Sequence, residues 1–215
     1  MKWTMPWLVL FGLLLGSGAS AVTSGQQDDF SASTDSWQRG SAALGGPGGA
    51  SDGFLLFSSD GTTMNGRLVT FNQSQWSGNY LGAGVDAVAI FMRNLGQTDL
   101  QMRVALGTSA APAVGGTWFA STQAVSLPAG GFWQLFVFPL GSADLTRVQG
   151  TASYDTVMSG VATLRILDSA APSAFGDNIV ASLGIDRIVA VPEPGTGLLV
   201  SAGLLSLARR RRGRQ

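Results

Sequence analysis

Leu100-Gln101-Met102-Arg103-Val104 alternates apolar and polar side chains, which is the period-two pattern of a β-strand with one buried face. Two further runs, residues 133–138 and 164–167, are dominated by apolar side chains and predict strands in a mostly buried setting. Residues 85–92 and 185–191 fit strands as well. The body of the chain is therefore predicted to be built from β-strands.

Helical patterns are scarce in the same part of the chain. Between residues 22 and 191 no stretch of twelve or more residues keeps a 3.6-residue apolar period, and we expect two short helical turns, at 144–148 and 156–159. Glycine-rich turn signals separate the strands, among them Gly45-Gly46-Pro47-Gly48-Gly49. Many short strands between such turns predict an all-β fold, a single β-sandwich domain spanning residues 22–191.

The composition excludes several kinds of chemistry. The 215 residues include no Cys and no His, which removes disulfides, thiolate nucleophiles, His-ligated metals and a Ser-His-Asp triad. The formal net charge is zero, but residues 22–191 hold seven Arg against twelve Asp, a net charge of −5. Because nucleic-acid recognition needs a clustered basic face, we predict no nucleic-acid partner.

The N-terminus has the three parts of a secretory signal peptide. Lys2 precedes an apolar run at residues 7–15, and small residues follow, ending in Ala19-Ser20-Ala21. We expect signal peptidase to cleave near Ala21, so that residues 1–21 are removed. The alternative, an uncleaved membrane helix, is disfavoured because the apolar run is short for a membrane span.

The C-terminus, residues 192–215, also has three parts. Pro192-Glu193-Pro194 ends any preceding strand or helix, because proline cannot donate to a ladder. Residues 195–208 are apolar and predict a single transmembrane helix. The basic cluster that follows would hold its side of the membrane in the cytoplasm; it consists of Arg209, Arg210, Arg211 and Arg212.

This three-part order resembles the PEP-CTERM sorting signal of Gram-negative bacteria. The resemblance implies that an exosortase, an integral membrane protease, recognises Pro192-Glu193-Pro194 and processes the protein. It also implies an exported protein that is first tethered in the inner membrane and then reaches the cell surface or the extracellular polysaccharide. The alternative is an ordinary tail anchor in which Pro-Glu-Pro occurs by chance.

The order of segments within the domain resembles the jelly roll of galactose-binding-like modules, which include carbohydrate-binding modules and laminin B-type domains. The matching residues are Asp28-Asp29-Phe30 and Asp35-Ser36-Trp37 at the opening, Leu164-Arg165-Ile166, and the closing Ile185-Asp186-Arg187-Ile188. The resemblance implies that the opening and closing segments lie close together. Arg187 departs from the pattern, because those modules more usually have Asn there. A generic β-sandwich is the alternative.

The same resemblance implies a structural calcium ion near the joined ends of the domain. Calcium prefers six to eight hard oxygen ligands, which carboxylates and backbone carbonyls supply. Asp28, Asp29 and Asp186 are the candidate ligands. The alternative places Asp28 and Asp29 in a solvated lead-in and pairs Asp186 with a nearby Arg.

Exposed aromatic side chains are the candidate sugar-binding residues. Trp76 and Tyr80 stand in polar surroundings, next to Asn72-Gln73-Ser74-Gln75 and Ser77-Gly78-Asn79, and are candidates for stacking on sugar rings. The alternative is that they pack in the core, where large aromatic residues usually lie. For Trp37, Trp118 and Trp133 we expect the core.

Enzymatic activity has little support in this sequence. A glycosidase needs two carboxylates at a set separation, and among so many Asp residues accidental pairs such as Asp52 with Asp60 carry no weight. We therefore predict a non-catalytic surface or extracellular-matrix protein sorted by an exosortase-like system. A carbohydrate-binding module is the first alternative, and an Asp-based hydrolase is the second.

Overall fold

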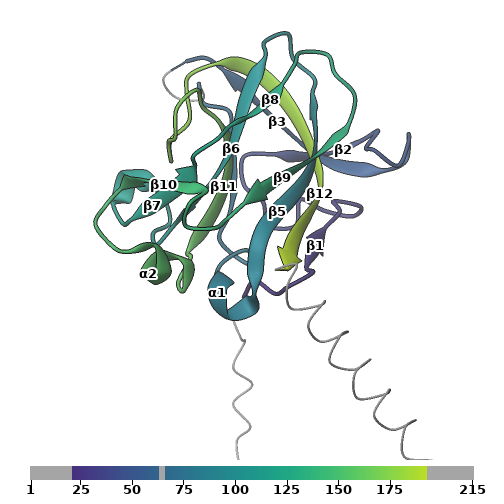
Figure 1. Ribbon diagram of the computed structural model, residues 1–215. Coiled ribbons are helices and arrows are strands. Elements are labelled where there is room, and N and C mark those ends of the chain that lie inside the picture. Colours follow the sequence, from purple (N-terminus) through teal and green to yellow (C-terminus); the bar gives the residue numbers. More distant parts are fainter. Residues whose placement is uncertain (1–20, 63–65, 193–215) are drawn as a thin grey trace, which may run out of the picture.

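Two antiparallel sheets of six strands each pack face to face in the computed structural model, which describes residues 21–62 and 66–192 (Figure 1). Sheet I has the order β2-β3-β12-β5-β9, with β1 paired to β12. Its strands are β1 (Gln27–Asp28), β2 (Ser41–Leu44), β3 (Gly53–Asp60), β5 (Val85–Asn94), β9 (Gln134–Pro139) and β12 (Val180–Pro192).

Sheet II has the order β10-β7-β6-β11-β4, with β8 paired to β6. Its strands are β4 (Val69–Asn72), β6 (Leu100–Gly107), β7 (Trp118–Ser121), β8 (Val125–Leu127), β10 (Leu145–Gln149) and β11 (Thr163–Asp168). The helical elements are short: α1 (Tyr80–Ala83), the 3₁₀ turn η1 (Pro112–Val114) and α2 (Tyr154–Met158). The fold is a jelly-roll-like β-sandwich, as the sequence predicted.

The two ends of the described domain meet in sheet I. Gln27 of β1 pairs with Val189 of β12, and Asp28 pairs with Ile188, so the first and last strands lie side by side (Figure 1). This confirms the prediction that the opening and closing segments are adjacent. It also joins residues far apart in the sequence, so β1 can be held only once β12 is in place.

The main core fills the space between the sheets. Alternate residues of the strands point inward, as the pleat of a strand requires. Val104 and Leu106 of β6, Leu164 and Ile166 of β11, and Ile185 of β12 are all fully buried. The predicted strands over residues 85–92, 100–104, 164–167 and 185–191 are thus confirmed.

Two local predictions need adjustment, and a third is confirmed. Residues 144–148 were expected to form a helical turn, but Leu145–Gln149 is the edge strand β10, because it pairs with β7. The predicted strand at 133–138 exists as β9, yet it lies at the edge of sheet I and its outward side chains Leu135 and Val137 are exposed. The turn predicted at 156–159 is confirmed by α2.

The terminal signals lie largely outside the described residues. The predicted signal peptide, apart from Ala21, and the segment from Glu193 onward, with its predicted helix and arginine cluster, are among them. Within residues 21–62 and 66–192, no helix has the length and apolar character that a membrane crossing requires.

Candidate functional site

Asp28 of β1 is the centre of a buried hydrogen-bond cluster. Its Oδ2 accepts hydrogen bonds from Nε1 of Trp37 at 2.7 Å and from Nε1 of Trp76 at 2.6 Å, and from Nε2 of Gln75 at 3.0 Å. The two indole rings lie 6.2 Å apart between centroids. One carboxylate therefore ties β1 to the loop before β2 and to the loop after β4.

Burial raises the pKa of Asp28 above its ordinary value of 3.8, and the hydrogen bonds from Trp37, Trp76 and Gln75 oppose that rise by stabilising the charged form. The negative charge of Asp35 raises the pKa further. Three donors occupy Oδ2, so this carboxylate acts as an internal structural acceptor.

The structure buries both candidate sugar-stacking residues. Trp76 and Tyr80 are each 0% exposed. Trp76 donates to Asp28, and the Tyr80 hydroxyl donates to the carbonyl of Trp76 at 2.9 Å. The prediction that these two rings form an exposed sugar platform is wrong, because the buried carboxylate draws the indole inward while the polar neighbours of Trp76 form the surface turn around it.

The three candidate calcium ligands are not gathered into one site. Among residues 21–62 and 66–192, no group of three or more acidic side chains is placed to hold a metal ion. Asp28 faces the indoles, and Asp29 instead accepts from the backbone N–H of Ser31 in an exposed turn. Asp186 is buried beside Arg187, as the alternative interpretation expected.

Arg187 supplies the positive charge near Asp186. Its Nε lies 3.6 Å from Oδ2 of Asp186, and its Nη2 lies 3.5 Å from Oδ2 of Asp52. The pKa of Asp186 is raised to about 6, mainly by burial and also by the charges of Asp52 and Asp29, while the backbone N–H and the charge of Arg187 oppose the rise. The Arg187 guanidinium thus lies between the carboxylates of Asp186 and Asp52.

The remaining tryptophans, Trp37, Trp118 and Trp133, were expected in the core. The structure places each of them differently. Trp37 is buried in the main core, as predicted. Trp118 is fully buried too, but it lies on the outer face of sheet II. Trp133 is half-buried; it packs edge-on against Phe54, 5.2 Å between centroids, and donates to the carbonyl of Gly45.

The outer face of sheet II combines apolar, aromatic and cationic side chains. By strand alternation it is formed by the residues that point away from the main core. A second apolar cluster lies there, made of Val69, Ala105, Trp118, Ala120, Leu167 and Ala174. Arg165 of β11 lies beside it, paired in register with Phe71 of β4.

Trp118 is locked in place on this face. Its Nε1 donates to Oγ of Ser109 and to the carbonyl of Gly115, both at 3.1 Å. Its ring lies directly on Gly107 of β6, where a Cβ would come within 2.2 Å of the indole. Only glycine leaves room for this close approach, so the ring orientation is fixed by the backbone beneath it.

Arg165 and Phe71 form a cation–aromatic pair that the sequence analysis did not anticipate. The guanidinium carbon of Arg165 lies 5.6 Å from the Phe71 ring centroid and 5.8 Å from that of Trp118. The available signal was a charged residue at the centre of the apolar run Leu164-Arg165-Ile166-Leu167. An arginine within such an apolar run indicates that the second face of the strand is also partly covered by other side chains.

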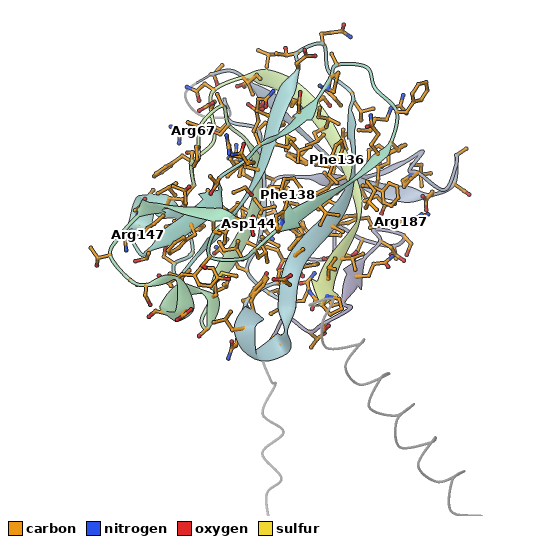
Figure 2. The ribbon with its side chains drawn as sticks, viewed as in Figure 1. Arg67, Phe136, Phe138, Asp144, Arg147 and Arg187 are labelled. Atoms are coloured by element: carbon orange, nitrogen blue, oxygen red, sulfur yellow. The ribbon has the colours of Figure 1, made fainter. Side chains whose placement is uncertain are left out.

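A separate hollow of about 180 Å³ lies where β7 and β8 meet β9. Its lining includes Thr122, Gln123, Val137, Phe138 and Asp144. Figure 2 shows Phe138 and Asp144 near one another in this part of the sandwich. Asp144 is the one acidic side chain among the described residues lining the hollow, whereas a glycosidase uses a pair of carboxylates.

Residues 190–212 match the family model of the PEP-CTERM protein-sorting motif. The match contains Pro192-Glu193-Pro194, the apolar segment and Arg209–Arg212, so the chain carries this sorting motif. The comparison with curated proteins gives no match.

Solved structures similar to this chain include carbohydrate-binding modules. The family 11 carbohydrate-binding module of Clostridium thermocellum, solved with a β-1,3-1,4-mixed-linked tetrasaccharide, has a TM-score of 0.52 and 14% identity, covering 80% of this chain and 98% of that one. The family 11 module of a cellulosomal cellulase from Clostridium thermocellum has a TM-score of 0.51 and 12% identity, covering 80% and 96%. The central domain therefore has the jelly-roll fold of these modules.

Proposed function

We propose that this protein is an exported, non-catalytic surface protein that is sorted through its PEP-CTERM motif and binds extracellular polysaccharide with its β-sandwich. The match at residues 190–212 carries the sorting half of the proposal. An exosortase-like protease would process the membrane-tethered precursor, after signal peptidase has removed the N-terminal segment. The processed protein would then reside at the cell surface or in its matrix.

Likeness of fold supports the binding half. Two structures that share the jelly roll over nearly their whole length are carbohydrate-binding modules, and one of them was solved with an oligosaccharide. The outer face of sheet II offers what sugar recognition uses: the half-buried ring of Phe71, the ring of Phe175, which is 36% exposed, and the exposed donors of Arg39 and Arg67. We place the binding surface there instead of at Trp76 and Tyr80.

Sorting is tested by Glu193→Ala, which removes the acidic residue between the two prolines. We expect at least about a tenfold fall in the amount of protein released from the membrane, because a protease that reads a tripeptide loses its one charged contact. Immunoblots of membrane and extracellular fractions measure the precursor and the product. Asp155→Ala, which removes an exposed carboxylate from α2, is the matched control. Equal release of Glu193→Ala and wild type would contradict the proposal.

Binding is tested by native gel electrophoresis of the full-length protein in a non-ionic detergent. Gels that contain the polysaccharide secreted by the source bacterium, or a mixed-linkage β-glucan, should retard the protein relative to a gel without polymer. The dependence of the retardation on polymer concentration gives the affinity of the protein for the polysaccharide. Unchanged mobility in every polysaccharide would refute the binding half and leave the sorting half standing.

A further inference from the structure

Three arginines from separate parts of the chain converge on the outer face of sheet II. Arg165 lies on β11, which pairs with β4. Arg67 lies two residues before β4, where its backbone bridges to Asn178. Arg39 follows Gln38, whose N–H donates to the carbonyl of Phe71 at 2.9 Å. Since all three segments are fastened to β4 or to its neighbour, the three side chains share one region of the face.

The position of Arg39 is held firmly. The hydroxyl of Thr70 on β4 donates to the carbonyl of Gln38 at 2.7 Å, which adds a second bond between this loop and the sheet. Arg39 itself has a φ of +64°, a left-handed conformation that non-glycine residues adopt at a cost. The loop therefore presents Arg39 in one defined backbone geometry.

Arg165 is nearly buried and incompletely paired. It is 8% exposed, and its Nε has no hydrogen-bond partner among the described residues. Its guanidinium lies between the rings of Phe71 and Trp118, which stabilise the cation through their π-faces but accept no strong hydrogen bond. A buried donor without a partner is costly, so such groups in folded proteins usually serve a ligand or a bound water.

The positive charges of this cluster are not neutralised within the domain. Among residues 21–62 and 66–192, the two ion pairs within 4.0 Å both belong to Arg187, and no carboxylate pairs with Arg39, Arg67 or Arg165. Figure 2 shows Arg67 and Arg187 on different sides of the sandwich. The pKa of Arg165 is lowered to about 10, mainly by burial and also by the charges of Arg39 and Arg67.

This cationic cluster occurs in a domain whose net charge is −5. Twelve Asp were available to pair with seven Arg, yet three of those Arg lie together without one. The fourth arginine of this face, Arg103, differs: its guanidinium donates to four backbone carbonyls, those of Ser121, Thr122, Ser169 and Ala170. Arg103 is thus satisfied internally, whereas no carboxylate of the described residues pairs with Arg39, Arg67 or Arg165.

The side chains around the arginine cluster indicate which class of anion it would bind. A planar guanidinium matches a planar carboxylate through two parallel hydrogen bonds. Phe71 and Phe175 flank the cluster; the guanidinium carbon of Arg67 lies 5.2 Å from the Phe175 ring centroid. Aromatic faces beside such a guanidinium can pack against the apolar face of a sugar ring that carries the carboxylate.

We propose that the outer face of sheet II, through Arg39, Arg67 and Arg165, binds an acidic polysaccharide whose sugar rings carry carboxylate groups. This inference rests on the proposed polysaccharide-binding function and names its substrate class. Phe71, Phe175 and Trp118 contact the arginines and shape the apolar part of the site.

The experiment compares polymers of different charge, in which polygalacturonate and its fully methyl-esterified form share one backbone. The full-length protein in non-ionic detergent is run in native gels that contain polygalacturonate, its fully methyl-esterified form, dextran sulfate or a neutral mixed-linkage β-glucan. We expect retardation by polygalacturonate at least about tenfold stronger than by the esterified polymer, and a fall in affinity as salt rises. Stronger retention by dextran sulfate than by polygalacturonate would overturn the assignment to carboxylates.

Variants then locate the site. Arg67→Gln and Arg39→Gln change exposed side chains, and each should weaken polygalacturonate binding about tenfold. Arg165→Met roughly keeps the length of a buried side chain but removes its charge, and it should weaken polygalacturonate binding by more than that. Arg147→Gln is the matched control, because it removes one positive charge from exposed β10 and should change affinity less than about twofold. Thermal unfolding of each variant checks that the fold is intact.

The outcomes separate the inference from the proposed function. Equal loss of polygalacturonate binding in Arg67→Gln and Arg147→Gln, or no loss in either, would overturn the proposed site. Retention by the neutral β-glucan without retention by polygalacturonate would overturn the acidic class while polysaccharide binding survives. Free mobility in every gel would overturn polysaccharide binding itself.

Discussion

Replacing Trp76 by alanine is expected to lower the free energy of unfolding by about 3–5 kcal/mol, the usual cost of truncating a large aromatic side chain in a core. Trp76 is fully buried, packs against Trp37 and donates its indole N–H to Asp28. The change therefore leaves a large cavity and removes one donor from a buried carboxylate. Urea denaturation of the full-length protein in non-ionic detergent, followed by circular dichroism, measures the difference.

Phe132→Ala is the matched control for this experiment. Phe132 is also aromatic but is 84% exposed, so its truncation should change the free energy of unfolding by less than about 0.5 kcal/mol. An equally small effect for Trp76→Ala, accompanied by loss of polysaccharide binding, would contradict the buried placement and return Trp76 to the role of a sugar-stacking residue.

Replacing Asp28 by alanine is expected to lower the free energy of unfolding by about 2–4 kcal/mol. The substitution leaves the indole N–H groups of Trp37 and Trp76 without an acceptor, and each buried unsatisfied donor costs about 1–3 kcal/mol. We expect a loss in the lower part of the range for two unsatisfied donors, because burying the charged carboxylate of Asp28 is itself unfavourable, as its raised pKa shows. The same denaturation experiment measures the loss.

Two variants make the Asp28 result specific. Asp29→Ala removes the neighbouring carboxylate, which is exposed and accepts one hydrogen bond from Ser31, and should cost less than about 1 kcal/mol. Asp28→Asn keeps an oxygen acceptor of the same shape and should fall between Asp28→Ala and wild type. Similar losses for Asp28→Ala and Asp29→Ala would show that the two-indole hydrogen-bond cluster does not stabilise the fold.

The tryptophans illustrate what local sequence can and cannot predict. We expected Trp37, Trp118 and Trp133 in the core, and this holds for Trp37, which lies in the main core. The polar neighbours of Trp76 suggested exposure, yet burial is decided by Asp28, a residue nearly fifty positions earlier that accepts from its indole. A polar loop can bury one side chain when that side chain donates a hydrogen bond to a buried acceptor. Composition alone does not reveal which residue is the acceptor.

The candidate calcium ligands are not gathered together, for a related reason. Asp186 and the opening carboxylates do lie in the same region, since β1 pairs with β12 and Asp28 pairs with Ile188. Their side chains, however, face different partners: Asp28 the indoles, and Asp186 the guanidinium of Arg187. The departure from the family pattern at Arg187 was visible in the sequence, but its consequence depends on the 3.5 Å approach of Arg187 to Asp52, which only the folded chain brings about.

The sequence by itself determined the C-terminal sorting signal and the all-β class, and the N-terminal signal peptide stays a prediction. A sorting signal is read as a linear order of short parts, and strand periodicity is a property of adjacent residues, so neither needs long-range contacts. Only the tertiary structure decided which side chains meet: it buries Trp76 and gathers Arg39, Arg67 and Arg165, which are far apart in the chain, around Phe71. The reason is that sheet pairing and register set which faces carry which residues, and these depend on contacts between distant strands.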